Sequence, residues 1–160
     1  MPLTLVTEYG GWPNRKVIDF YLQFATTVFK RYRHKVKYWM TFNEINCVKH
    51  HPYVSVGVIE EDHPALEQAK YQGAHHQFVA SALATKACHE IIPESKVGCM
   101  ISYQILYPHT CHPDDIQACE DAQRVSLFFS DVQARGAYPA WSDRMFAAKG
   151  VVLKKERGDD

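Results

Sequence analysis

The spacing of hydrophobic residues along the chain predicts three helices and two strands. Apolar side chains recur every three or four residues in three segments, which is the period of an amphipathic helix. These segments cover residues 14–33, 65–92 and 114–135, and their predicted buried faces include Phe24 in the first, Ala82 and Leu83 in the second and Ile116 in the third. Compact apolar runs at residues 36–42 and 96–102 are typical of buried strands. Asn14 is placed to cap the first helix and Gly136 to end the third.

The order helix, strand, helix, strand, helix indicates an α/β protein with a parallel sheet, because a parallel strand pair needs a crossover connection. A short apolar run near Leu3 reads as a trace of a further strand. We expect one structural unit over residues 1–153, followed by a solvated, frayed tail at residues 154–160.

Composition and charge indicate an ordinary globular chain that binds a small ligand. The 160 residues are 46% hydrophobic and 22% charged, and 18 basic side chains balance 18 acidic ones. This neutral balance argues against nucleic acid or an anionic membrane as the partner. No apolar run reaches the roughly 20 residues that span a bilayer. The five cysteines are scattered without a C-x-x-C pair, and we expect free thiols in the cytoplasm.

The candidate chemistry lies where the first strand ends in an amide and a carboxylic acid, Asn43 and Glu44. In parallel α/β barrels the loops after the strands form the active site, so a carboxyl group at a strand tip is in a catalytic position. Flanked by Phe42 and Ile45, the carboxyl of Glu44 could deliver a proton to a leaving oxygen. The amide of Asn43 suits a sugar hydroxyl. From spacing alone, Glu44 could equally cap the next helix or pair with a neighbouring cation.

The segment from Trp39 to Glu44 resembles the motif that carries the acid/base glutamate in family 1 glycoside hydrolases, which are retaining β-glycosidases with a TIM barrel. Similarity to the cytoplasmic 6-phospho-β-glucosidases of that family covers residues 41–46, 75–84 and 97–100. The resemblance implies that Glu44 is the general acid/base and that Asn43 hydrogen-bonds the sugar 2-hydroxyl. It also implies a phosphorylated β-glucoside as the substrate, and neither a metal nor an organic cofactor.

The same resemblance implies that the chain is a central fragment of the enzyme, roughly strands 4 and 5 with helices 3 to 5 of an incomplete (β/α)8 TIM barrel. A retaining mechanism needs a second carboxylate about 5–5.5 Å from the first. No other carboxylate here ends a strand; the rest lie on predicted helices or, like Asp62, in a loop. We therefore expect the isolated chain to be inactive, and marginally stable because its strands leave edges and apolar faces uncovered.

Two alternatives stay open from the sequence. The intact enzyme could act on unphosphorylated β-glucosides, or the chain could be a non-catalytic remnant that binds sugar or a partner protein. Two further motifs carry less weight. The group His109, Cys111 and His112 is too isolated for a closed four-ligand metal site and reads as the loop that opens the third helix. The basic run at residues 30–37 suits the last turn of a helix better than a nucleic-acid contact.

Overall fold

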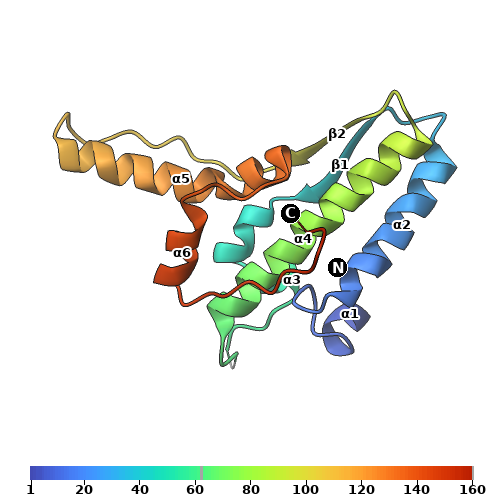
Figure 1. Ribbon diagram of the computed structural model, residues 1–160, viewed down its shortest axis with the longest axis horizontal. Coiled ribbons are helices and arrows are strands. Elements are labelled where there is room, and N and C mark those ends of the chain that lie inside the picture. Colours follow the sequence, from blue (N-terminus) through green and yellow to red (C-terminus); the bar gives the residue numbers. More distant parts are fainter. Residues whose placement is uncertain (62, 160) are drawn as a thin grey trace.

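The computed structural model describes residues 1–61 and 63–159 and confirms the predicted order of helices and strands. Asp62 of the predicted loop and Asp160 of the predicted tail lie outside the described residues. The main elements are α2 (Lys16–Tyr32), β1 (Tyr38–Asn43), α4 (Leu66–Ile91), β2 (Lys96–Met100) and α5 (Pro113–Arg135) (Figure 1). The strands pair in parallel, with Tyr38 opposite Lys96 and Asn43 opposite Met100, as the alternation predicts.

The predicted end of α5 at Gly136 is confirmed, whereas the N-cap residue of α2 is Arg15, one residue after the predicted Asn14, and it makes no side-chain cap bond. The side-chain Oδ1 of Asn14 accepts a hydrogen bond of 3.1 Å from the backbone N–H of Lys16, in the first turn of α2. Gly136 adopts a left-handed φ of 69°, and its N–H donates to the carbonyl of Val132. Glycine takes this conformation without steric cost, so α5 ends where the sequence predicts.

Shorter helices fill the connections: α1 (Leu3–Thr7), the 3₁₀ helix η1 (Ile45–Lys49), α3 (Pro52–Val56) and α6 (Ser142–Ala148). The predicted strand near Leu3 is wrong, because these residues form α1. Residues two positions apart lie on opposite sides of a helix, so Leu3 is in solvent while Leu5 packs against the core. A run this short does not distinguish helix from strand. In the described part of the chain, no helix combines the length and hydropathy of a membrane span.

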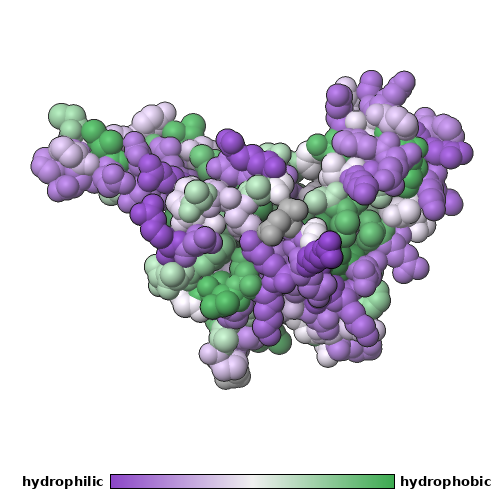
Figure 2. Space-filling model, viewed as in Figure 1, coloured by the Kyte–Doolittle hydropathy of each residue, from purple (hydrophilic) through white to green (hydrophobic). Residues whose placement is uncertain are grey.

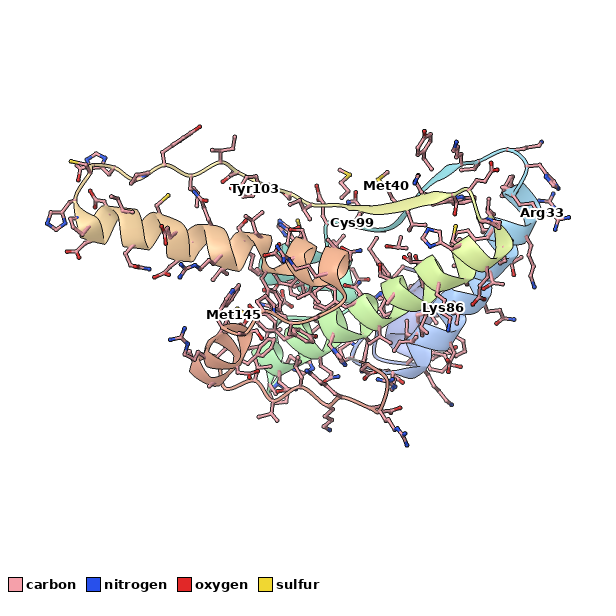
Figure 3. The ribbon with its side chains drawn as sticks, turned by 45° about the horizontal axis from the view of Figure 1, so that its top comes forward. Arg33, Met40, Lys86, Cys99, Tyr103 and Met145 are labelled. Atoms are coloured by element: carbon pink, nitrogen blue, oxygen red, sulfur yellow. The ribbon has the colours of Figure 1, made fainter. Side chains whose placement is uncertain are left out.

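Helices α2 and α4 pack against one face of the two-stranded sheet. Trp39 of β1 meets Phe29 of α2 edge to face at 4.9 Å, and both belong to a cluster with Cys88 of α4. The opposite face is open, with Tyr38 73% and Met40 68% exposed. Figure 3 shows Met40 on the side of the sheet away from the helices. Parallel sheets are ordinarily covered on both faces, whereas here helices cover one face and the other is exposed to solvent.

Helix α4 is the centre of the molecule, and its first half is buried on all sides. Buried polar side chains in this half make specific hydrogen bonds: His76 Nδ1 lies 2.7 Å from the carbonyl oxygen of Trp12, and Gln77 Nε2 donates to the carbonyl of Ser55 at 2.8 Å. The predicted apolar stripe is only partly correct, because Ala82 and Leu83 are exposed. The helix is surrounded rather than laid on one surface, so polar residues share its core positions.

Helix α5 and the segment 101–112 beside it form an arm that extends from the body (Figure 1). In the space-filling view the arm mixes hydrophobic and hydrophilic surface (Figure 2). Only the inner end of α5 is buried, through Phe128, Phe129 and Val132. Ile116, predicted on the inward side, is exposed. Its helical spacing is correct, but at this end the described chain offers no surface for it to cover.

Residues 154–159 lie across α4 and are anchored there, which differs from the frayed tail expected from the sequence (Figure 1). Arg15 donates two hydrogen bonds to Asp159, at 2.8 and 2.6 Å, and His75 Nε2 lies 3.2 Å from the same carboxylate. The Asp159 side chain is 2% exposed. The Arg15 guanidinium holds the pKa of Asp159 well below its usual range, while burial lowers the pKa of His75. The buried carboxylate of Asp159 therefore anchors the end of the tail, and the Gln72 amide, which bonds the N–H and the carbonyl of Lys154, anchors its start.

We predict that Asp159→Asn lowers the free energy of unfolding by about 2 kcal/mol, because it removes a charge-assisted pair with Arg15. Urea unfolding measures the loss, and trypsin cleavage after Lys154 or Lys155 reports release of the tail. The matched control is Glu156→Gln, since Glu156 pairs with the same arginine at 3.1 Å but is 66% exposed. The control is expected to cost less than about 1 kcal/mol. Equal losses in the two variants would refute the anchoring role of Asp159.

Candidate functional site

Glu44 follows directly after the last residue of β1 and sits in a strained backbone conformation. Its φ of 50° and ψ of 53° are left-handed, and it is the one non-glycine residue with positive φ in the described ranges. This conformation costs an ordinary residue roughly 1–2 kcal/mol. It persists only where the surroundings enforce it, and such positions cluster at functional sites.

Hydrogen bonds on both sides hold Glu44 in place. Its backbone N–H donates to the carbonyl of Met100, the last residue of β2, at 2.8 Å. Its own carbonyl accepts from the N–H of Cys47 at 2.9 Å, which starts the turn of η1. The side chain thus leaves the sheet at the carboxyl edge, where the tips of β1 and β2 meet.

Asn46 makes a second connection between the two strand tips. Its Nδ2 donates to the carbonyl of Ser102 at 2.5 Å, and its Oδ1 accepts from the N–H of the same serine at 3.2 Å. The residue is buried. One amide therefore satisfies the backbone donor and acceptor of a residue just after β2.

A polar group beneath the tip ties β1 to two helices. The Thr41 hydroxyl lies 2.7 Å from that of Ser81 on α4, and Gln133 of α5 donates to both oxygens at 3.2 Å. On the α2 side, the Tyr21 hydroxyl donates to the Thr41 carbonyl at 2.6 Å. Burial raises the pKa of Tyr21 to about 12, so it remains a neutral donor. These contacts fix the strand three residues before Glu44.

A cavity of about 710 Å³ opens beside the tip of β1. Its lining is mostly apolar and comes from α1, α2, α3 and β1, with Asn43, Glu44 and Cys47 among the polar groups. Phe24, predicted on the buried face of α2, is 64% exposed and lines it. Among the described residues, Glu44 is the sole carboxylate in this lining. The volume is in the range of small-molecule sites.

Cys47 touches the candidate acid. Its Sγ lies 3.5 Å from Oε2 of Glu44. Burial, followed by the hydrogen bond and charge of Glu44, raises the pKa of the Cys47 thiol. The sulfur therefore stays protonated near neutral pH and acts as a weak donor to the Oε2 atom of Glu44.

The structure places the two predicted site residues at the same strand tip, with Asn43 exposed and Glu44 half-buried. The structure supports neither of the two alternative roles of Glu44. Its side chain makes no cap bond to η1, and no cation pairs with it among the described residues. Asn46 and Cys47 were missed from the sequence. Both stand beside the recognised motif, but no spacing rule pairs Asn46 with Ser102.

Residues 109–115 open α5, as the sequence indicates. His112 is the N-cap residue, and its Nδ1 accepts from the N–H of Asp114 at 3.3 Å. Asp115 accepts from both the N–H and the hydroxyl of Thr110, at 3.0 and 2.5 Å. The polar side chains of this loop therefore satisfy helix and loop groups. In the described chain, no group of three or more His, Cys, Asp or Glu side chains is arranged to hold a metal ion.

Comparison with known proteins links this geometry to a family. The family model described as Glycosyl hydrolase family 1 matches residues 1–160. The chain is 57% identical over 160 residues to aryl-phospho-β-D-glucosidase BglH of Bacillus subtilis (strain 168), and 51% identical over 160 residues to 6-phospho-β-glucosidase AscB of Escherichia coli (strain K12). Each match covers 100% of this chain and 34% of the relative. The chain thus spans about a third of the length of these curated relatives.

Solved structures share the fold over the same extent. Virulence factor SghA from Agrobacterium tumefaciens superposes with a TM-score of 0.80 at 23% identity, covering 100% of this chain and 34% of that chain. A family 1 β-glucosidase from Thermotoga maritima gives a TM-score of 0.73 at 22% identity, covering 94% and 33%. The backbone arrangement is therefore retained at low sequence identity.

We predict that Thr41→Val lowers the free energy of unfolding by about 1 kcal/mol, because it leaves Ser81 and Gln133 without their shared partner. The substitution keeps the branched shape of the side chain, so the effect reports the hydrogen bonds. Thr27→Val is the matched control, since the Thr27 hydroxyl is exposed and donates to the Gln23 carbonyl within α2. Urea unfolding compares the two variants. If the control loses as much stability as Thr41→Val, the polar group does not stabilise β1.

Proposed function

Because this chain belongs to glycosyl hydrolase family 1, we propose that it forms the part of a retaining β-glycosidase that carries the general acid/base, Glu44. One observation carries the proposal: a strained glutamate is fixed at the carboxyl edge of a parallel sheet and faces a cavity. In barrels of parallel strands, this edge is where catalytic groups gather. We assign β1 and β2 to the fourth and fifth strands of such a barrel.

In the proposed reaction Glu44 acts twice. It first donates its proton to the glycosidic oxygen, so the bond from that oxygen to the anomeric carbon breaks and the aglycone leaves as an alcohol. A second carboxylate attacks the anomeric carbon and forms a covalent glycosyl-enzyme. Glu44, now ionised, removes a proton from water as the water displaces that carboxylate. Both groups end in their starting protonation states.

Asn43 is proposed to orient the sugar. Its side chain is exposed at the end of β1, directly before Glu44. An amide can both donate to and accept from a hydroxyl, and we assign the sugar 2-hydroxyl as its partner. Hydrogen bonds to that hydroxyl strengthen as the transition state forms, so the contact supports rate as well as binding.

We propose a phosphorylated β-glucoside as the substrate class. The support is the names of the relatives: those at 57% and 51% identity are called aryl-phospho-β-D-glucosidase and 6-phospho-β-glucosidase. Groups that would bind the phosphate are not assigned to this chain. The second carboxylate is also unassigned, since Glu44 is the sole acid lining the cavity in the described residues. On this proposal the isolated 160-residue chain has no turnover.

The acid/base role is testable in a complete enzyme in which this chain replaces the matching third of the Bacillus subtilis relative. Glu44→Gln is expected to lower kcat/KM for an aryl 6-phospho-β-glucoside by about 10²–10⁴-fold. In Glu44→Ala, azide is expected to raise kcat for a 2,4-dinitrophenyl 6-phospho-β-glucoside, whose leaving group needs no proton, and to yield a β-glycosyl azide, because azide attacks the glycosyl-enzyme without a general base.

The controls separate chemistry from folding. Glu90→Gln changes an exposed acid on α4 and is expected to leave activity unchanged, while the isolated chain is the negative control. Full activity in Glu44→Gln, or turnover by the isolated chain that depends on Glu44, would contradict the proposal.

The preference of the same hybrid enzyme tests whether residues 1–160 are compatible with a phosphorylated substrate. We expect it to retain, within about tenfold, the preference of its parent for p-nitrophenyl 6-phospho-β-glucoside over p-nitrophenyl β-glucoside, a difference below about 1.4 kcal/mol. Because the rest of the enzyme is identical, any change is attributable to residues 1–160. A shift of several hundredfold toward the unphosphorylated glucoside would favour the alternative substrate class.

A further inference from the structure

Asn46 is a buried polar side chain that the proposed reaction does not use. It lies two residues after Glu44, within η1, and is 4% exposed. Both ends of its amide are satisfied by the backbone of Ser102, at 2.5 and 3.2 Å. This paired arrangement fixes distance and orientation together, because moving either segment breaks two hydrogen bonds at once.

The connection acts on the turn that carries Glu44. Upstream, the N–H of Glu44 is held by the carbonyl of Met100; downstream, the Asn46 amide holds η1 to Ser102. Glu44 therefore stands between two attachments, one to the last residue of β2 and one to the segment that follows it. Its left-handed backbone directs the side chain toward the cavity. Without the downstream attachment, η1 could rotate and the backbone could relax to a more favourable conformation.

Such a relaxation would redirect the carboxyl group. Moving φ and ψ of Glu44 out of the left-handed region turns its Cα–Cβ bond relative to the end of β1. A displacement of about 1 Å at a reacting group can cost on the order of 10²-fold in rate. The lost step would be proton transfer, whereas groups that bind the sugar from elsewhere would be unaffected.

We propose that Asn46 is a positioning residue for the acid/base Glu44, acting by locking η1 to the segment after β2. The inference rests on the proposed function of Glu44. Its distinctive consequence is a dependence on the leaving group. A dinitrophenolate departs without protonation, whereas a phenolate needs the proton from a correctly placed acid.

The test uses the hybrid enzyme with phenyl and 2,4-dinitrophenyl 6-phospho-β-glucosides. Asn46→Ala is expected to lower kcat/KM about 10–100-fold for the phenyl substrate and less than about threefold for the dinitrophenyl substrate. In a Glu44→Ala background, the same change is expected to have no further effect on the phenyl substrate, because residues that act as one unit are non-additive. Equal losses on the two substrates, or an undiminished loss without Glu44, would overturn the inference.

Two variants keep the result interpretable. Asn14→Ala is the matched control, since the Asn14 amide also donates to one backbone carbonyl, that of Tyr9, and accepts from one N–H, that of Lys16. It is expected to lower the melting temperature without a leaving-group effect. If Asn46→Ala does not fold, Asn46→Asp keeps the shape and the acceptor but loses the donor to Ser102. Asn46→Asp is expected to show the same larger loss on the phenyl substrate than on the dinitrophenyl substrate. Equal activity losses on the two substrates would refute the positioning role.

The outcome for Asn46 is separable from that for Glu44. If Glu44→Gln shows no loss with the phenyl substrate, the proposed function itself fails. If Glu44→Gln shows the loss and the Asn46 variants do not, the function stands and the positioning inference alone fails.

Discussion

The site depends on the connection between the carboxyl ends of β1 and β2. Parallel pairing brings both ends to one edge of the sheet, and the hydrogen bond from Glu44 to Met100 continues the pairing one residue beyond β1. At that point the chain turns sharply into η1 through a left-handed residue. A strained turn of this kind needs external support, and the segment after β2 supplies it through Ser102. The acid is therefore placed by its neighbouring strand as well as by its own loop.

Helix α4 holds distant segments of the molecule together through hydrogen bonds of its buried polar side chains. Its buried face presents hydrogen-bonding groups where an amphipathic helix would present only aliphatic ones. His76 reaches the carbonyl of Trp12 ahead of α2, Gln77 reaches Ser55 in α3, and His75 reaches the tail through Asp159. The first two bonds satisfy backbone carbonyls, and the third adds to the two hydrogen bonds that Arg15 donates to Asp159. Distant segments are thus fixed in register around one helix.

The elements with strong periodicity could be predicted from the sequence, because α2, α5 and both strands are defined by local spacing, caps and turn residues. The position of Asn43 and Glu44 at a strand tip was predictable for the same reason. The burial of His75 and the anchoring by Asp159 were not, since they join residues 84 positions apart. The hydrogen bonds between Asn46 and Ser102 likewise join residues 56 positions apart. Long-range polar pairs leave no periodic signal, so only the folded arrangement reveals them.

The open face of the sheet affects the stability of the sheet but not the geometry of Glu44. Tyr38 and Met40 leave large apolar surfaces in solvent, and burying such a side chain contributes about 1.5–3 kcal/mol. Cover from additional strands would thus stabilise the sheet by more than the strain at Glu44 costs. Yet the bonds that orient Glu44 run within the edge of the sheet, to Met100 and through Asn46, and do not involve the open face. The geometry of the acid is consequently a property of these residues, whereas the rigidity with which it is held increases as the open face is covered.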